Sequence, residues 1–405
     1  MLIPAMKEAG WEVEVLYPDQ SYQAAYSFDP ECTQYYPEVS EHPVGSWMPG
    51  IFRALGSRSI GIRGGAPLAR QGLELLQSRK YDVVYFSTTQ HLLTCAGPWW
   101  RKKTGVPYVA DVHDPVYIPH PKYRTSRNGL KAILARQMGR WIERRALAQA
   151  DGIVSVSRGY IDDLLLRNPC SRWARSEMED GRRKVGLNKL GHVLVQPFPA
   201  DERALEMAKA ERGRAGKKRI VYVGAGGTIM EKGWREFLEA LKKESASREI
   251  IIEIYGTNPF WKEGDRRFLQ AIAEEMGLPG VVIEEPPRVS YERSLALVKG
   301  ADGLLVLGVD DPNYQPSKLH TYLATGLPIM VLARAGSALP DQLRGVGDGV
   351  GLLEFGEGGR GQLEGGIRCY LEAVKGANRW LGRRFLTAGE GVLAHIKFFE
   401  KVTRK

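Results

Sequence analysis

The stretch YQPSKLHTYLATGLPIMVL, residues 314–332, governs the interpretation of the whole chain. Pro316 and Ser317 are typical of a helix start, apolar residues then recur at helical spacing, and Gly326 with Pro328 ends the pattern. The apolar run at 327–332 has the length of a buried strand. The stretch therefore predicts a short helix that leads into a strand of a sheet.

Ser317 and Lys318 stand at the start of this predicted helix. A helix N-terminus carries unpaired N–H groups and a partial positive charge, so a hydroxyl and an ammonium group placed there suit a phosphate or diphosphate. The alternative is an ordinary helix–strand unit in which Ser317 only caps the helix. This stretch alone leaves both interpretations open.

Strands and helices alternate through both halves of the chain. Predicted strands lie at 12–17, 81–88, 107–112, 150–157, 219–227, 249–256, 281–287 and 327–332, and 192–201 reads as a strand followed by a turn broken by proline. Predicted helices lie at 2–10, 68–80, 91–103, 130–150, 159–166, 234–243 and 265–276, and 289–308 reads as a helix followed by a strand. Because this alternation is typical of parallel sheets, the predicted fold class is α/β with two Rossmann-like, doubly wound domains.

The turn broken by proline within 192–201 is the expected interdomain linker. It divides the chain into domains at 1–197 and 198–389. Two more helices are expected after residue 332, and the last, at 392–402, would return to the first domain, so that 390–405 completes it. Residues 19–65 show no clear period and are predicted to be irregular or partly helical, and 167–190 are polar and basic.

The composition, 43% hydrophobic and 26% charged over 405 residues, is that of a globular protein of two or three domains. The four cysteines form no CxxC pair, which argues against a zinc site or a disulfide framework and favours a reducing compartment. No apolar run is long enough to span a bilayer and no signal-peptide pattern begins the chain. We therefore expect a cytoplasmic location, with contact at the inner face of a membrane still open.

The formal net charge of +10 predicts an acidic partner. Much of this charge lies between Trp99 and Leu147, with eleven basic residues against three acids. The basic residues are Arg101, Lys102, Lys103, Lys122, Arg124, Arg127, Lys131, Arg136, Arg140, Arg144 and Arg145, and the acids are Asp111, Asp114 and Glu143. The helix within 130–147 adds a broad apolar side to several of these cations, a pattern suited to an anionic membrane surface. Nucleic acid, a phosphorylated substrate or a solvated face would also account for the charge.

Two further segments are candidates for ligand contact. His113 and Asp114 follow the apolar strand at 107–112, and ligands of open parallel sheets bind beyond the carboxyl ends of strands. This pair is therefore a candidate for catalysis, with a turn or capping role as the alternative. The segment RIVYVGAGG at 219–227 ends in glycines that let a phosphate approach, and Lys232 follows at the next helix start. Alone, this pattern is neither a dinucleotide fingerprint nor a P-loop.

The segment PSKLHTYLATGLPI resembles the donor-binding segment of retaining nucleotide-sugar glycosyltransferases of family 4, which have the two-domain GT-B fold. ADGIVSVS at 150–157, with Glu143 upstream, resembles a second segment of that family, and the glycines before Lys232 and Gly233 resemble its G…KG turn. The likeness extends over most of the chain. It implies two Rossmann-like domains that face each other across a cleft holding the donor.

The resemblance also implies residue roles. The leaving diphosphate would be bound by Lys232, Ser317 and Lys318 and by the backbone N–H groups of Gly226, Gly227 and Leu319. Gly256, Asp310, Asp311, Asn313 and Thr321 complete the implied donor site, and His113 with Asp114 would face the donor sugar. The family needs neither a metal nor another cofactor, so none is expected here.

Two departures from the family pattern are visible. The two glutamates spaced E-x7-E are replaced by Asn313 and Thr321, although Asp310 and Asp311 offer a substitute for the first. The chain also begins inside the first helix, where the family has a preceding strand and glycine-rich turn, so we expect a truncated N-terminus or an incomplete site.

Three functions are compatible with these patterns. The first is a hexosyl-type glycosyltransferase that moves a sugar from a nucleotide-diphosphate donor to a glycan or lipid-linked acceptor, in cell-surface polysaccharide or glycolipid synthesis. The second is a sugar-nucleotide-binding protein of the same fold that has lost catalysis. The third is a nucleic-acid-binding protein, which we do not expect because no RNA or DNA module is recognisable.

Overall fold

The computed structural model describes residues 2–19, 39–45, 60–117, 130–179, 182–187, 192–213, 216–343, 345–357 and 363–404. Its contacts divide these residues into two units. The C-terminal unit comprises 198–390, and the N-terminal unit comprises 2–197 together with 391–404. We describe each unit by itself.

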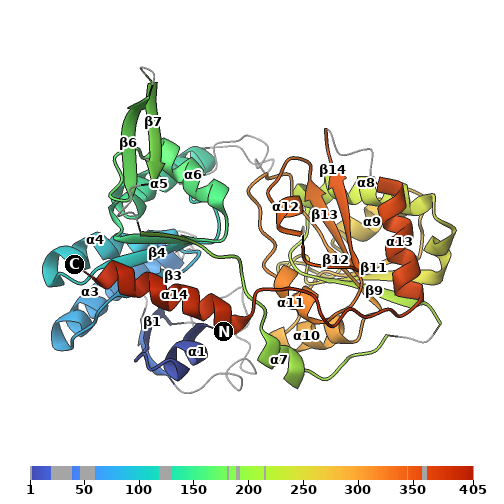
Figure 1. Cartoon of the computed structure of the whole chain (residues 1–405), viewed down its shortest axis with the longest axis horizontal. Coiled ribbons are helices and arrows are strands. Elements are labelled where there is room, and N and C mark those ends of the chain that lie inside the picture. Colours follow the sequence, from blue (N-terminus) through green and yellow to red (C-terminus); the bar gives the residue numbers. More distant parts are fainter. Residues whose placement is uncertain are drawn as a thin grey trace. The chain divides into compact units, whose positions relative to one another are not determined.

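The C-terminal unit is built on one sheet of six parallel strands (Figure 1). The strands are β9 (Lys218–Val223), β10 (Ile250–Tyr255), β11 (Val282–Glu285), β12 (Gly303–Val306), β13 (Ile329–Arg334) and β14 (Val350–Phe355). Their order across the sheet is β11-β10-β9-β12-β13-β14. In this order the chain begins near the middle, builds one side and then returns to build the other, as in doubly wound nucleotide-binding folds.

Helices cover both faces of this sheet because alternate strand residues point to opposite sides. In β9, Ile220 and Tyr222 join one hydrophobic cluster, and Val221 and Val223 join the other. The helices are α7 (Glu202–Met207), α8 (Glu231–Lys242), α9 (Phe268–Glu275), α10 (Tyr291–Lys299), α11 (Leu319–Ala324), α12 (Leu339–Leu343) and α13 (Leu363–Lys375), with 3-10 turns at Thr228–Met230 and Ser245–Glu249.

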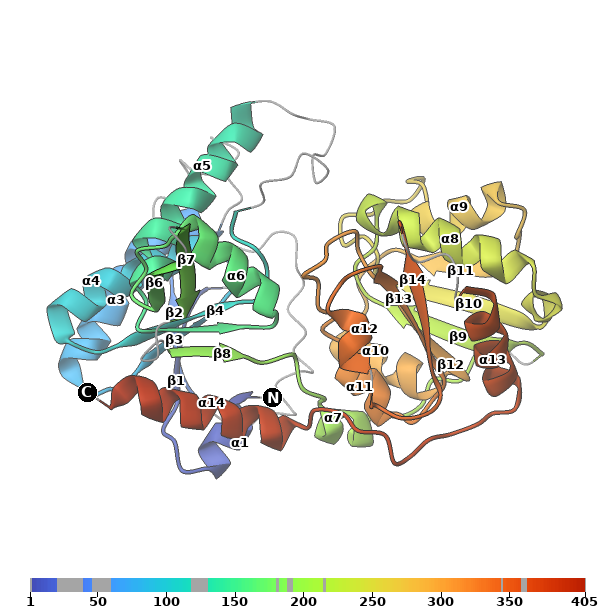
Figure 2. The ribbon, with the colours of Figure 1, turned by 45° about the horizontal axis from the view of Figure 1, so that its top comes forward.

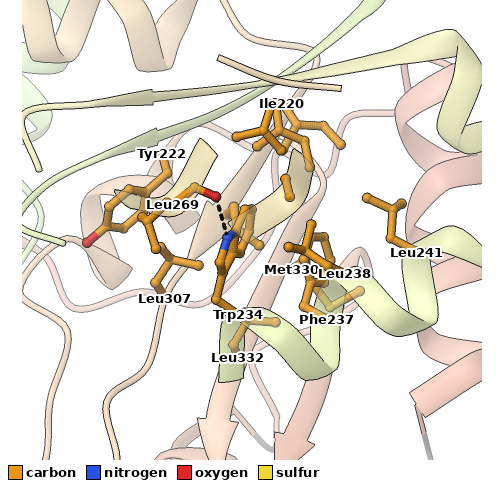
Figure 3. Packing of buried hydrophobic residues seen from close by; sticks show 14 of the residues in the cluster. Ile220, Tyr222, Trp234, Phe237, Leu238, Leu241, Leu269, Leu307, Met330 and Leu332 are labelled. Carbon is orange, nitrogen blue, oxygen red and sulfur yellow. Dashed lines mark hydrogen bonds between the residues drawn. The ribbon is translucent and has the colours of Figure 1, made fainter. Parts of the chain in front are cut away.

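Trp234 anchors helix α8 in the larger cluster of the C-terminal unit. Its side chain is fully buried beside Phe237, and its indole N–H donates a 3.0 Å hydrogen bond to the carbonyl of Leu269 at α9 (Figure 3). The indole therefore adds apolar contact while its one donor is satisfied. This packing fixes α8 against the sheet and α9.

The N-terminal unit has a smaller parallel sheet with the order β3-β4-β5-β8. These strands are β3 (Val84–Ser87), β4 (Tyr108–Val112), β5 (Gly152–Ser155) and β8 (His192–Val195). A parallel pair, β1 (Glu14–Pro18) and β2 (Ser40–Val44), lies apart from this sheet, and an antiparallel hairpin is formed by β6 (Ala174–Glu179) and β7 (Arg182–Leu187).

Both faces of the N-terminal sheet are covered as well. Tyr108 and Ala110 of β4 pack with the cluster that holds Leu68 and Trp100, whereas Val109 packs with Met6 and Phe399. The helices are α1 (Leu2–Glu8), α3 (Ile60–Ser78), α4 (Ala96–Thr104), α5 (Leu130–Arg145), α6 (Arg158–Arg167) and α14 (Ala388–Thr403), with 3-10 turns at His91–Cys95 and Leu147–Gln149.

Helix α14 returns from the C-terminal unit and packs on the N-terminal unit from Gly391 onward. Figure 2 shows it running along the sheet beside α1. Phe399 is 1% exposed and lies 5.2 Å, centroid to centroid, from the ring of Tyr85 on β3. Two segments distant in sequence thus share one hydrophobic cluster.

The predicted α/β fold class is confirmed, since both units have a parallel sheet with helices on both faces, and the strand order reverses in the C-terminal sheet. The partly helical character predicted for 19–65 is confirmed by the first turn of α3, although strand β2 in the same segment was not predicted. No element was predicted within 167–190, which contains the β6–β7 hairpin. The prediction of two helices after residue 332 was wrong, because the described residues there form β14 and three helices. In the described residues no helix is long and apolar enough to cross a bilayer.

Candidate functional site

The strand order of the C-terminal sheet reverses between β9 and β12. These two strands pair only at Gly303 with Ile220 and at Leu304 with Val221. On its other side, β9 stays paired with β10 as far as Val223. The carboxyl ends of β9 and β12 therefore diverge, and in open α/β sheets this reversal is where ligands bind.

Helix α11 fills the inner part of the gap between these strands. The Tyr322 hydroxyl accepts a 3.2 Å hydrogen bond from the Val223 N–H, which β12 does not pair. Tyr322 is 2% exposed, so an N–H buried there without a partner would be costly. The Tyr322 side chain of α11 therefore satisfies the last N–H group of β9.

Lys318 reaches the end of β9 from the start of α11. A Cβ added at Gly224 would collide with the Lys318 Nζ and lie 3.0 Å from the Tyr222 hydroxyl, so the ammonium group lies against this glycine. Burial, and to a smaller extent the charge of Arg288, lowers the pKa of Lys318 to about 8. Over the described ranges, no carboxylate forms an ion pair with Lys318. A desolvated cation without a counter-ion suits an anionic ligand.

Arg288 is a second cation at this edge that sequence analysis missed. It follows β11, and its Cα lies 4.0 Å from the position of a Cβ added at Gly256, just beyond β10. Its charge acts on Lys318. The signal available in the sequence was its place shortly after a predicted strand, which is the criterion that selected His113.

The glycines beyond the strands continue the backbone ladder. The N–H of Gly226 donates to the Thr257 carbonyl at 3.0 Å, and that of Gly256 donates to the Glu285 carbonyl at 2.9 Å. Leu319 N–H likewise donates to Pro316. The N–H groups of Gly226 and Leu319, which we predicted as donors to a diphosphate, are thus engaged with the backbone in this structure. Gly227, with φ of 139°, has open space where a Cβ would stand.

Lys232 does not join Lys318. It lies in the first turn of α8, is exposed, and its Nζ is 3.1 Å from the position of a Cβ at Gly356, beyond β14. Three strand spacings separate β14 from β9, roughly 14 Å at the usual ~4.8 Å per strand. The two lysines that the family pattern joins are thus at different places along the sheet edge.

The loop between β12 and α11 places the remaining predicted donor residues. Asp310 accepts a 2.8 Å hydrogen bond from Arg334, and an Asp311 oxygen accepts one at 2.8 Å from the Asn313 N–H. Helix α11 begins at Leu319 with Lys318 as its N-cap residue, so the prediction of a helix start at Pro316–Ser317 was wrong, and Ser317 is exposed. Thr321 is half-buried on α11.

His113 and Asp114 lie beyond β4 in the N-terminal unit. The Nε2 of His113 is 2.7 Å from Oδ2 of Asp111, a residue that sequence analysis placed inside the strand and did not select. Burial lowers the pKa of His113, but the hydrogen bond to Asp111 and the charges of Asp111 and Asp114 outweigh it and raise the pKa overall. Asp114 is exposed.

The two acids of the family-like segment hold elements together. Buried Glu143 of α5 accepts two hydrogen bonds from Arg167 of α6, at 3.0 and 2.8 Å. Asp151 accepts from the Tyr108 N–H at 3.1 Å and pairs with Arg101 at 2.9 Å. One cation of the basic segment, Arg101, is therefore used within the unit.

Comparisons with known proteins agree on the fold. Residues 1–172 match the family model of a glycosyl transferase 4-like domain. No curated protein matches this chain in sequence.

Three solved structures are similar over nearly the whole chain. A glycosyltransferase from Rickettsia africae has a TM-score of 0.58 at 10% identity, covering 100% of this chain and 93% of that one. Anabaena HepE in complex with UDP-glucose has a TM-score of 0.53 at 12% identity, covering 96% and 97%. The N-terminal domain of Candida albicans trehalose-6-phosphate phosphatase has a TM-score of 0.51 at 14% identity, covering 97% and 86%. At these identities the likeness shows the fold alone.

Proposed function

We propose that this protein is a nucleotide-sugar glycosyltransferase that transfers a hexosyl group, with retention of anomeric configuration, to a glycan or lipid-linked acceptor. The single observation that carries the proposal is the desolvated Lys318 ammonium beside Gly224, at the reversal of strand order in the C-terminal sheet. The family match of residues 1–172 supports it from the other half of the chain.

In this proposal the departing diphosphate gains negative charge that preorganised cations stabilise. Lys318 and Arg288 supply that charge at the end of β9, and Lys232, Ser317, Gly227, Gly256, Asp310, Asp311, Asn313 and Thr321 remain the proposed surrounding donor site. His113 would contact the transferred sugar or steady charge at the reacting carbon.

Calorimetry with UDP, GDP, ADP and CMP tests the binding part of the proposal. Release of the nucleotide from the matching sugar donors, with product NMR to read the anomeric configuration, tests transfer and retention. Binding of a nucleotide without transfer or hydrolysis would favour the second candidate, a sugar-nucleotide-binding protein. The replacement of both family glutamates by Asn313 and Thr321 supports this candidate. Salt-sensitive RNA or DNA binding without nucleotide binding would reject both.

Helix α5 supports a further part of the proposal, which is contact with an anionic membrane surface. Its inner side packs through Gly139, Ile142 and Glu143, while Ile133, Leu134, Met138 and Trp141 are 49%, 58%, 42% and 49% exposed. Leu134, Met138 and Trp141 follow each other at helical spacing and form one stripe. Figure 2 shows the start of α5 extending beyond the sheet of its unit.

Exposed cations flank this apolar stripe. Arg140, Arg144 and Arg145 are exposed on the last turns of α5. Lys122, Arg124 and Arg127, and the side chain of Lys131, lie outside the described residues. An apolar stripe bordered by arginines suits the interface of an anionic bilayer, where each cation contributes about 1 kcal/mol. Such docking would bring the protein to a lipid-linked acceptor in polysaccharide or glycolipid synthesis at the inner membrane face.

A further inference from the structure

Asp111 lies at the centre of a buried polar cluster in the N-terminal unit. It is 4% exposed on β4, and it points to the same side of the strand as Val109, which packs against the cluster of α14. A carboxylate this deeply buried requires hydrogen-bond donors or a positive charge nearby. The side chains that contact Asp111 are Tyr85 and His113.

Two side chains donate to one oxygen of Asp111. The His113 Nε2 lies 2.7 Å from Oδ2, and the Tyr85 hydroxyl donates to the same oxygen. Burial raises the pKa of Tyr85 well above its ordinary value, and the Asp111 charge raises it further. Tyr85 therefore keeps its proton and donates a hydrogen bond to Asp111, as His113 Nε2 approaches the same oxygen.

Two more imidazoles, those of His91 and His395, lie near Asp111 and His113, and their pKa values shift in the opposite direction to that of His113. Burial lowers the pKa of His91 at the 3-10 turn and of His395 on α14. The ring of His395 lies 6.0 Å from that of Tyr85, and its Nδ1 is 2.7 Å from the Gly391 carbonyl. Only His113 touches the carboxylate and has a raised pKa. The cluster thus favours charge on the one imidazole that stands beyond the end of the strand.

We propose that Asp111 is a positioning residue for His113: together with Tyr85 it holds the imidazole at Nε2 and so fixes the orientation of the ring beyond β4. This inference rests on the proposed function, because it explains how one residue of the proposed site is held. In the proposed function this ring would contact a sugar hydroxyl or a phosphate. A purely structural Asp111 would stabilise the unit without influencing His113.

The first test follows the imidazoles of the whole protein by 1H–15N NMR. Asp111→Asn keeps the size of the side chain, and we expect it to lower the pKa of His113 by about one unit or more, since a carboxylate contact typically shifts a pKa by ~1–3 units. Asp114→Asn, an exposed neighbour, is the matched comparison and should produce a smaller shift. An unchanged His113 pKa in Asp111→Asn overturns the proposal.

Tyr85→Phe keeps the proposal testable if Asp111→Asn does not fold. It removes the competing donor and leaves the His113 contact in place, so the His113 pKa should hold or rise. A fall in that pKa contradicts the arrangement, because it would mean that Tyr85, and not Asp111, supports the charged imidazole.

The second test measures turnover of whichever nucleotide-sugar the protein uses. With Asp111→Asn, kcat/KM should fall about tenfold at pH 8 for each pKa unit lost by His113, and less at pH 6, since one unit changes the protonated fraction tenfold. In a His113→Ala background the substitution should have no further effect. Additive losses, or an unchanged pH profile, overturn the inference while leaving the glycosyltransferase proposal intact. Absence of turnover with every nucleotide-sugar removes the proposed function, and the NMR test still decides whether Asp111 holds His113.

Discussion

Lys318 is a residue at which ligand binding and protein stability conflict, because its ammonium is desolvated without a paired carboxylate in the described structure. The native pKa of about 8 lies below the ordinary value of 10.5. Below pH 8 the native state therefore bears the full cost of the buried charge, and this cost is relieved as the pH rises above 8. A bound diphosphate would compensate the same charge.

We predict that Lys318→Met raises the melting temperature at pH 7 and weakens UDP binding by about 1.5–3 kcal/mol, the range for hydrogen bonds to charged groups. In the parent protein, UDP affinity should decline as the pH rises through 8, because the ammonium loses its proton. Calorimetry between pH 6.5 and 9.5 measures both.

Lys217→Met is the control, since Lys217 is exposed just before β9, at the opposite end of the strand. Equal UDP affinity in the Lys318 and Lys217 variants would refute the phosphate assignment. Lys232→Ala tests the sequence pattern against the structure. The pattern predicts that this variant loses as much UDP affinity as the Lys318 variant, whereas the position of Lys232 beside Gly356 predicts a smaller loss of affinity.

His320 gives the C-terminal unit a sensitivity to acid. Its Nδ1 accepts a 3.0 Å hydrogen bond from the Leu386 N–H, which requires the neutral ring, and burial lowers its pKa to about 4. Because this value lies below the ordinary 6.5, the stabilisation is present above pH 6.5 and is lost as the pH falls toward 4.

We predict that lowering the pH from 6.5 to 5 costs the C-terminal unit about 2 kcal/mol through His320, at about 1.36 kcal/mol for each pH unit. His320→Asn supplies an acceptor that does not titrate and should remove this share of the pH dependence. Urea unfolding of the parent and the variant at both pH values provides the measurement. Parallel losses in the two proteins would show that other groups account for the acid sensitivity.

At the scale of an element, helix α5 has one buried face and one exposed apolar stripe. Ile142 is 4% exposed, whereas Trp141 is 49% exposed one residue earlier. The sequence predicts that some apolar residues of this helix pack on the sheet, and the structure shows that those in its first turns do not.

We predict that the protein co-sediments with vesicles containing anionic lipid and not with neutral vesicles, and that high salt releases it. Arg140→Gln with Arg144→Gln should weaken binding about thirtyfold, from about 1 kcal/mol for each cation. Arg70→Gln, an exposed arginine on α3, is the control. Equal binding to neutral vesicles, or none to either kind, would leave this helix as a solvated face.

At the scale of the whole molecule, the chain returns to its first unit through α14. Phe399 packs with Val109 of β4 and Val154 of β5 and is 1% exposed. The last segment of the chain therefore contributes to a core formed mainly by the first 197 residues.

Phe399→Ala should reduce the stability of the N-terminal unit by about 3–5 kcal/mol, as is usual for a large aromatic side chain removed from a core. Hydrogen exchange read by mass spectrometry should show loss of protection in β3, β4 and β5, with β9–β14 unchanged. Phe237→Ala in the C-terminal cluster is the reciprocal control. Loss of protection in both sheets after either substitution would mean that the two units unfold as one.

The sequence by itself determined the elements whose patterns are local. Strand–helix alternation predicted the parallel sheets, and glycines and cations after strands pointed to Lys318, His113 and the glycine turn, because hydrophobic period and turn chemistry depend on residues only a few positions apart. The hairpin β6–β7 and strand β14 were missed, since neither shows a strong period in a polar or glycine-rich setting.

Only the tertiary structure decided which side chains meet. Because of the strand order, Lys232 lies at the end of β14, away from Lys318. Arg288 lies near Lys318, although thirty residues separate these two in the sequence. The proposed role of Asp111 depends on Tyr85 of the neighbouring strand, which donates a hydrogen bond to it, and on α14, which packs on the same side of the sheet. The physical reason is that a sheet places the ends of non-consecutive strands side by side, so the partners of a buried charge depend on the order of strands and not on spacing in the sequence.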